Sequence, residues 1–187
     1  MYGEEFIFQD YLSDISICDK LIDYFQSSPQ HEGLSAGGVN KELKNSTDVA
    51  LEPGTLSKEY ISLLQEKVEK YSDKFPFCTN SDRWEIVSTI QIQRYLPNEG
   101  YYAWHTERNV GYQPMCSRHL VFMTYLNDVI DGGGTEFYHQ KLITKAKKGL
   151  TLIWPTDWTF MHRGEVSPTQ TKYIITGWFN YIDTETK

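Results

Sequence analysis

The sequence is poor in cysteine and contains no block of basic residues. Its three cysteines, Cys18, Cys78 and Cys116, have no short spacing between them. They predict neither a disulfide framework nor a zinc site, favour a reducing compartment, and are expected to be small core residues. The net charge of −7 is spread along 187 residues. Because binding to phosphates needs clustered Lys and Arg, a nucleic-acid partner is not expected.

Long apolar runs and internal repeats are also missing. The first residues, MYGEEFIFQD, are acidic and lack the basic region and apolar run of a signal peptide, and no segment is apolar over the length of a membrane span. We therefore expect a cytoplasmic protein with no membrane contact. The length favours one domain over residues 1–187.

Two segments of the first eighty residues carry apolar side chains at helical spacing. Residues 13–28 and 56–73 are predicted helices, and Ser13 or Ser16 is the expected cap of the first. The polar stretch between them, HEGLSAGGVNKELKNSTDVALEPG, is interpreted as a loop because it is rich in glycine and turn residues. The helical part is expected to cover about residues 1–80.

From Trp84 onward the apolar period changes to two, which is typical of strands. Ile90 and Ile92 alternate with Gln91 and Gln93 in the segment 86–95. Further strands are expected at 101–106, 118–127, 134–138, 149–154, 160–163 and 172–182. Aromatic residues, at 14%, favour a strand-rich body with a lined cavity. The pattern predicts a mainly β fold with flanking α-helices, in which the helices pack outside a barrel or jelly roll over about 84–183.

The segment AWHTERN holds a histidine and a glutamate two positions apart. On a strand, such residues point the same way, so His105 and Glu107 can aim at one point. An imidazole and a carboxylate make two-thirds of the facial triad that binds non-haem Fe(II). The doublet alone is common by chance, and the missing ligand would be a histidine on a distant strand. His162 is a candidate because the predicted strands and turn around it bring it to a barrel mouth.

A lysine opens the last predicted strand. Lys172 shares one face of that strand with Ile174, Thr176 and Trp178. A lysine that faces inward is costly unless an anion pairs with it. The alternative is a lysine at an exposed strand end whose amine reaches water.

Three longer segments occur in one order. Residues 92–107 read IQRYLPNEGYYAWHTE, residues 117–137 include YLND and GGGTEF, and residues 147–178 include HRGEV and KYIITGW. Together they resemble the iron(II)- and 2-oxoglutarate-dependent dioxygenases, and within them most closely the prolyl 4-hydroxylases. The resemblance covers about half of the chain.

The resemblance implies a double-stranded β-helix, the jelly-roll barrel of that family, and His105, Glu107 and His162 as iron ligands. It also implies an oxidoreductase that uses Fe(II), 2-oxoglutarate and O2, with ascorbate as reductant. The implied reaction hydroxylates an unactivated C–H bond, on a prolyl residue of a peptide or protein, and releases succinate and CO2.

Further residues are matched to roles by the same resemblance. Lys172 would form an ion pair with the far carboxylate of 2-oxoglutarate, and Tyr95 and Thr176 would hydrogen-bond that carboxylate. Trp178 matches a tryptophan close to the iron site. Arg163 follows the distal histidine and could reach a substrate carbonyl or carboxylate, or could instead pair with Glu165 or another acid on the surface.

One position departs from most of the family, which has aspartate where this chain has Glu107. The extra CH2 moves the carboxylate by roughly 1.5 Å, whereas ligand distances tolerate about ±0.2 Å, so the backbone or the rotamer must adjust. The clavaminate-synthase-like branch, which includes hydroxylases of free amino acids, also uses glutamate here. A small-molecule hydroxylase and a non-catalytic binding module with a decayed metal site therefore stay open as alternatives.

The segment Arg108–Ser117 follows the doublet and contains Gly111 and Pro114. It is expected to be a mobile lid that brings Tyr112 or Arg108 to the substrate, or else a surface connection. Four tryptophans are expected to be packing residues: Trp84, Trp104, Trp154 and Trp158. The sequence indicates no oligomeric state.

Overall fold

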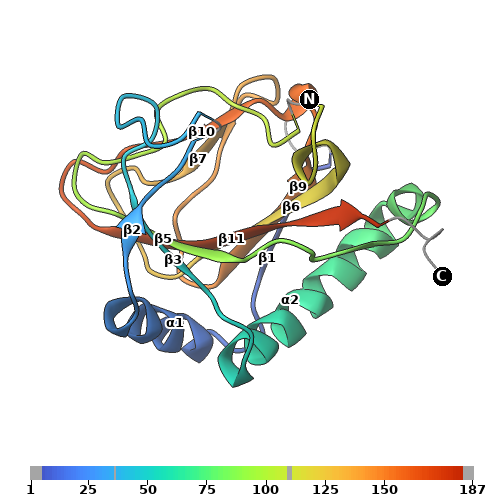
Figure 1. Ribbon diagram of the computed structural model, residues 1–187, viewed down its shortest axis with the longest axis horizontal. Helices are drawn as coiled ribbons and strands as arrows, with labels where there is room; N and C mark the ends of the chain where they lie inside the picture. Colours follow the sequence, from blue (N-terminus) through green and yellow to red (C-terminus); the bar gives the residue numbers. More distant parts are fainter. Residues whose placement is uncertain (1–5, 36, 109–110, 183–187) are drawn as a thin grey trace.

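The described residues form two antiparallel sheets and two α-helices, with short 3-10 turns between them (Figure 1). The computed structural model describes residues 6–35, 37–108 and 111–182. The larger sheet contains, in order, β1 (Phe8–Tyr11), β9 (Leu150–Pro155), β6 (Arg118–Tyr125), β11 (Lys172–Tyr181), β5 (Gln91–Tyr95), β3 (Thr47–Ala50) and β2 (His31–Glu32), with β4 (Trp84–Glu85) paired to β11. The smaller sheet contains β10 (His162–Gly164), β7 (Thr135–Phe137) and β8 (Leu142–Ile143).

The segment predicted as a strand at 101–106 joins the smaller sheet only through one isolated bridge, between His105 and His162, and one further backbone hydrogen bond. The His105 N–H donates to His162 O at 3.0 Å, the His162 N–H donates to His105 O at 2.9 Å, and the Gly164 N–H donates to Tyr101 O at 3.0 Å. This segment therefore runs along β10 without forming a regular strand. The remaining predicted strands are present with shifted ends, and the two facing sheets form the predicted jelly roll.

Both predicted helices are confirmed as α1 (Ser16–Ser27) and α2 (Thr55–Lys74). The predicted serine cap of α1 is wrong, because the Ser16 N–H donates to the Asp14 carboxylate at 2.8 Å instead. Figure 1 shows both helices on the outer face of the larger sheet. Their buried side chains pack against that face in one apolar cluster, which includes Leu21, Phe25, Tyr60, Leu64, Ile92, Phe122, Ile153 and Ile175.

The alternation along β11 separates this outer core from the inside of the jelly roll. Ile175 and Phe179 pack toward the helices, whereas Ile174 and Trp178 pack toward the inner cluster. The register of β11 against β6 shifts only between Phe179 and Asn180. Because that irregularity lies beyond Lys172, Thr176 and Trp178, the predicted common face of these three residues is preserved.

The prediction of a loop between the two helices is partly wrong, because this segment contains two short strands. β3 pairs with β5 in antiparallel register, with Val49 opposite Ile92, and β2 continues the sheet beyond it. β1, which was not predicted, pairs with β9. Strands of two to four residues carry too few side chains for a period of two to stand out, so only pairing with longer strands reveals them. In the part of the chain that is described, no helix has the length and apolarity to cross a membrane.

The glycine turn before β7 is built on left-handed backbone. Gly132 and Gly133 have φ values of +104° and +76°, a region that side-chain-bearing residues rarely adopt. A Cβ on Gly132 would lie 2.4 Å from Val166 O. The turn therefore requires glycine both for its conformation and for the space beside the chain.

The prediction that tryptophans and cysteines are packing residues is confirmed for some of them and wrong for one. Trp154 and Cys18 are buried in the core as expected. Trp158 is 68% exposed, which contradicts a packing role, because it lies in the short 3-10 turn η3 (Trp158–Phe160) at the surface. Cys78 and Cys116 are free thiols that are only half-buried.

Candidate active site

A cavity of about 350 Å³ lies between the two sheets and is lined by residues of both. Most of the sequence-predicted site residues line it: Tyr95, His105, Glu107, His162, Lys172, Thr176 and Trp178. Arg163 is not in its lining. The Arg163 Nε donates to Glu136 Oε2 at 2.8 Å, and its guanidinium lies 4.5 Å from the Trp104 ring centroid. Arg163 thus pairs with an acid, although with Glu136 in place of Glu165.

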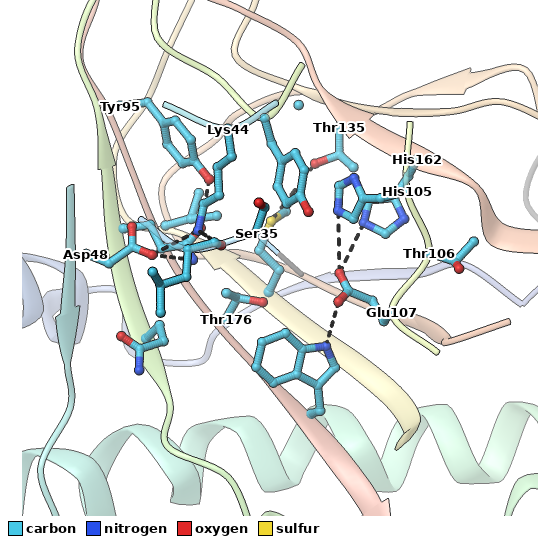
Figure 2. Close-up of a pocket in the computed structure, with 18 of the residues that line it drawn as sticks. Ser35, Lys44, Asp48, Tyr95, His105, Thr106, Glu107, Thr135, His162 and Thr176 are labelled. Carbon is cyan, nitrogen blue, oxygen red and sulfur yellow. Dashed lines mark hydrogen bonds and ion pairs between the residues drawn. The ribbon is translucent and has the colours of Figure 1, made fainter. Parts of the chain in front are cut away.

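Two histidines and a glutamate converge at one end of the cavity (Figure 2). Glu107 Oε1 lies 3.7 Å from His105 Nε2 and 3.4 Å from His162 Nε2. The potential ligand atoms of the three residues all lie within 4.8 Å of one another. The bridge between the backbones of His105 and His162 holds the two imidazoles side by side.

Each of these imidazoles is oriented by a backbone carbonyl. His105 Nδ1 donates to Ala103 O and His162 Nδ1 donates to Phe160 O, both at 2.9 Å. With the proton on Nδ1, the lone pair of each Nε2 faces the Glu107 carboxylate. Metal-ligating histidines are usually oriented in this way, by a hydrogen bond from the other ring nitrogen to a carbonyl or carboxylate.

The charge states of these residues also suit a metal ion. Burial, then the neighbouring His162, lower the pKa of His105 and favour its neutral form. Burial raises the pKa of Glu107, but the two histidines outweigh it and hold this pKa well below its usual range. The Nδ1 hydrogen bonds leave one Nε2 on each imidazole, and with the Glu107 carboxylate three donor atoms face the same point. This set matches the facial triad of non-haem Fe(II).

Lys172 is buried in another part of the cavity wall. Its side chain is 5% exposed, which excludes the exposed strand end considered above. Its Nζ donates to Glu165 O at 3.3 Å and lies 4.9 Å from the Tyr95 ring centroid, and it forms no salt bridge within the described residues. Burial lowers its pKa to about 8. A buried ammonium without a carboxylate partner is costly, and an anion in the cavity would offset that cost.

Tyr95 is part of a hydrogen-bonded chain that leads away from Lys172. Its hydroxyl donates to Gln93 Oε1 at 2.7 Å, and Gln93 Nε2 donates to Asp48 Oδ2 at 3.2 Å. Asp48 also pairs with Lys44 Nζ at 2.8 Å. Figure 2 shows Lys44, Asp48 and Tyr95 together, away from the two histidines. The ion pair was missed in the sequence because both residues lie in the stretch interpreted as a loop.

We expect Asp48→Ala to lower the free energy of unfolding by about 3–5 kcal/mol, because it leaves the Lys44 ammonium buried and unpaired. Lys44 is 4% and Asp48 3% exposed. Urea unfolding followed by circular dichroism measures the change. Lys20→Ala is the matched control, since it removes an exposed ion pair with Glu59 and should cost less than about 1 kcal/mol. Equal losses in the two variants would contradict the prediction.

Tyr125 was not singled out in the sequence, yet it is buried in the lining of the cavity. Its hydroxyl forms hydrogen bonds of 2.8 Å with Thr135 Oγ1 and Thr144 Oγ1. The alternation in 118–127 places it on the same face as Met123, which also lines the cavity. Thr176 Oγ1, by contrast, donates to the backbone oxygen of Phe122 at 2.9 Å.

The carboxylate of Glu107 has a second set of partners. Trp178 Nε1 donates to Oε2 at 3.0 Å. Arg118 Nη1 donates to the backbone oxygen of Glu107 at 2.9 Å and lies 3.4 Å from Oε2. The Arg118 guanidinium carbon is 3.6 Å from the Trp178 ring centroid. Arg118 was not predicted as a site residue, and it lines the cavity at the start of β6.

Most of the segment predicted as a lid, Arg108–Ser117, lies within the described residues. Arg108 pairs with Asp157 and Tyr112 is 55% exposed, and neither lines the cavity. Met115, in the 3-10 turn η2 (Met115–Ser117), does line it. Asn109 and Val110 lie outside the described residues. The described part of the segment contributes a methionine, and not the predicted tyrosine or arginine, to the cavity.

Comparisons with a protein family and with solved structures agree with this geometry. No curated protein matches the chain. Residues 90–180 match the 2OG-Fe(II) oxygenase superfamily. Among solved structures, the viral collagen prolyl hydroxylase of Paramecium Bursaria Chlorella virus-1, in its 2OG complex, is 22% identical, with 95% of this chain and 97% of that chain covered and a TM-score of 0.71.

Two further similar structures come from other organisms. A Pseudomonas putida prolyl-4-hydroxylase is 13% identical, with a TM-score of 0.72 and coverage of 94% of this chain and 92% of that chain. A Trichoplax adhaerens prolyl hydroxylase, in complex with a hypoxia inducible factor oxygen degradation domain peptide fragment, is 16% identical, with a TM-score of 0.71 and coverage of 94% and 84%. At these identities, the likeness shows that the fold is shared.

The family match spans β5 to β11 and includes the whole convergent set of His105, Glu107 and His162 together with Lys172. The fold, the donor set and the sequence match therefore agree. Residues 90–180, the part of the chain that carries the site, belong to the 2OG-Fe(II) oxygenase superfamily, a family of 2-oxoglutarate-dependent dioxygenases.

Proposed function

We propose that the cavity binds Fe(II) through His105, Glu107 and His162 and pairs the far carboxylate of 2-oxoglutarate with Lys172. The observation that carries this proposal is the convergence of two oriented Nε2 lone pairs and one carboxylate oxygen in the same cavity as a buried ammonium. Residues 1–187 act as a single catalytic domain, in which α1 and α2 support the larger sheet from outside.

When iron and 2-oxoglutarate are bound, they supply an oxidant made with O2 that hydroxylates an unactivated C–H bond, and succinate and CO2 are the co-products. The residues of the chain bind and orient. His105 and His162 keep their Nδ1 protons on backbone carbonyls, so that each Nε2 stays available. Lys172 neutralises a carboxylate in a buried setting, where the attraction is stronger than in water. Tyr95, Thr176 and Tyr125 line the cavity and help to fix the oxo acid.

The proposed substrate is a prolyl residue of a peptide or protein. This assignment rests on the prolyl-hydroxylase-like motifs of the sequence and on structural similarity to prolyl hydroxylases, one of them in complex with a peptide. Ascorbate is the proposed reductant. Glu107 reaches both histidines despite its extra CH2, which argues against a decayed metal site.

A free amino acid or another polar small molecule is the second candidate substrate. One part of the cavity is lined by the Lys44–Asp48 pair together with Gln91 and Gln93. Within the described residues, Gln91 Oε1 is buried without a hydrogen-bond partner. Such an acceptor suits a substrate that carries a polar hydrogen.

The test is succinate formation from 2-oxoglutarate by anaerobically purified protein supplied with Fe(II), ascorbate and then air. We expect proline-rich peptides to stimulate turnover in the wild type and in His139→Ala, whose histidine is exposed and outside the cavity. His162→Ala should be inactive. Turnover that free amino acids stimulate and peptides do not would favour the second candidate. Equal turnover in His162→Ala and wild type would overturn the iron site.

A further inference from the structure

We propose that Arg118 and Trp178 form a clamp on the outer oxygen of Glu107, so that this glutamate offers only Oε1 to the metal. The inference rests on the proposed function and deepens it. It assigns both side chains a positioning role, exerted through Glu107, at the place where the chain departs from the aspartate of most of the family.

The two oxygens of Glu107 face different partners. Oε1 lies 3.4 and 3.7 Å from the two imidazole Nε2 atoms. Oε2 accepts a hydrogen bond of 3.0 Å from Trp178 Nε1 and lies 3.4 Å from Arg118 Nη1. The dashed contacts of Figure 2 run from the Glu107 carboxylate to both histidines on one side and to an indole nitrogen on the other. The carboxylate is thereby oriented before any metal binds.

A glutamate needs such orientation more than an aspartate does. Its side chain has one more rotatable bond, and burying a long side chain in one rotamer costs conformational entropy. The carboxylate must also stand within a few tenths of an ångström of its position for good coordination. A charged donor and an indole N–H on Oε2 fix the rotamer, and hydrogen bonds to an ionised group are stronger than neutral ones.

The clamp is itself held in place. Arg118 Nη1 donates to the backbone oxygen of Glu107 at 2.9 Å, so the guanidinium is tied to the residue that it orients. The guanidinium lies 3.6 Å from the Trp178 ring centroid, within the range of a cation–π contact. Arg118 begins β6 and Trp178 lies opposite Val121 in the same sheet. The two donors therefore come from paired strands of the larger sheet.

A single bound oxygen has a consequence for the metal. A carboxylate that binds through both oxygens would occupy two positions of an octahedral ion, and with two histidines it would leave only two open. With Oε2 held by Arg118 and Trp178, the three protein ligands would leave three positions of the ion for a chelating oxo acid and O2. The clamp thus keeps a position free that a mobile glutamate could fill.

The experiment measures Co(II) binding by calorimetry, with Co(II) as an air-stable substitute for Fe(II). Trp178→Phe keeps an aromatic ring under Arg118 but removes the N–H. We expect it to raise the Kd for Co(II) about tenfold, within the range seen for losses in the outer shell of a metal site. The melting temperature of the metal-free protein should change little. Trp158→Phe, which alters an exposed tryptophan, is the control and should leave the Kd unchanged.

The same substitution in a Glu107→Asp background shows whether the effect passes through the glutamate. Aspartate is about 1.5 Å shorter, so we expect its carboxylate to lie out of hydrogen-bond reach of Trp178 Nε1, and Trp178→Phe should then change the Kd less than twofold. An unchanged Kd in Trp178→Phe, or an equal tenfold loss in the aspartate background, would overturn the clamp while leaving the iron site intact. A wild type that binds no Co(II) would instead contradict the proposed function.

Discussion

Replacing Lys172 by methionine is expected to raise the Kd for 2-oxoglutarate by about 30-fold to 5,000-fold. Removal of one partner of a buried charge pair costs about 2–5 kcal/mol, and Lys172 is the cation in the cavity wall without a salt bridge among the described residues. Methionine keeps the length and apolar stem of the side chain. Calorimetric titration of the Co(II)-loaded protein with 2-oxoglutarate measures the change.

Lys148→Met is the matched control for this substitution. Lys148 forms a salt bridge with Asp19, whose side chain is well exposed, and neither residue lines the cavity. The control should bind 2-oxoglutarate as the wild type does. If Lys172→Met also bound 2-oxoglutarate like the wild type, the carboxylate would lie elsewhere in the cavity.

The pKa of Lys172 gives the same site a pH dependence. Burial lowers this pKa to about 8 in the ligand-free protein, and only the protonated amine attracts a carboxylate. Above about pH 8, binding must therefore take up a proton, and the Kd should rise about tenfold per pH unit. Below that pH the affinity should be flat. The profile should disappear in Lys172→Met, and a wild-type affinity that stays constant from pH 7 to 10 would contradict this assignment.

The free energy of unfolding of the ligand-free protein should rise over the pH range in which the affinity for 2-oxoglutarate falls. The unfolded chain holds the Lys172 proton up to its ordinary pKa of 10.5, whereas the folded chain releases it near pH 8. Between these values the unfolded state binds more protons, so the free energy of unfolding rises with pH, by about 3 kcal/mol in all. Urea unfolding of the wild type and of Lys172→Met at pH 7.5 and 10 isolates this contribution, because other titrating groups act on both proteins.

Replacing His162 by alanine is the second change with a large expected effect. A metal at about 100 times its Kd stabilises the folded protein by about 2.7 kcal/mol. For a domain of this size that raises the melting temperature by about 5–10 °C. We expect Co(II) to give this rise in the wild type and a chelator to reverse it. His162→Ala should show little or no rise in melting temperature, because only two of the three metal ligands, His105 and Glu107, remain.

The control for the metal experiment is His139→Ala. His139 is exposed and contacts Tyr138 and Trp158 outside the cavity, so this variant should keep the full rise. Its retention shows that the loss in His162→Ala comes from the site and not from the removal of a surface metal contact. An equal rise in His162→Ala and wild type would place the metal elsewhere on the protein.

The sequence by itself predicted the features that depend on local periodicity and on motif order. Apolar spacing located α1 and α2, because a helix that packs on one side repeats every three to four residues over several turns. The period of two along β11 set Lys172, Thr176 and Trp178 on one face, and the structure keeps them there. The ordered motifs gave the family before any distance was known.

Only the tertiary structure decided contacts between distant segments. The strands β1, β2 and β3 exist because longer strands pair with them, and their own residues are too few to show a period. The Glu136 partner of Arg163 and the approach of Arg118 to Glu107 each depend on which distant segments lie next to each other. Local periodicity determines which way a side chain faces, whereas what it meets there depends on chain pairing across the whole fold.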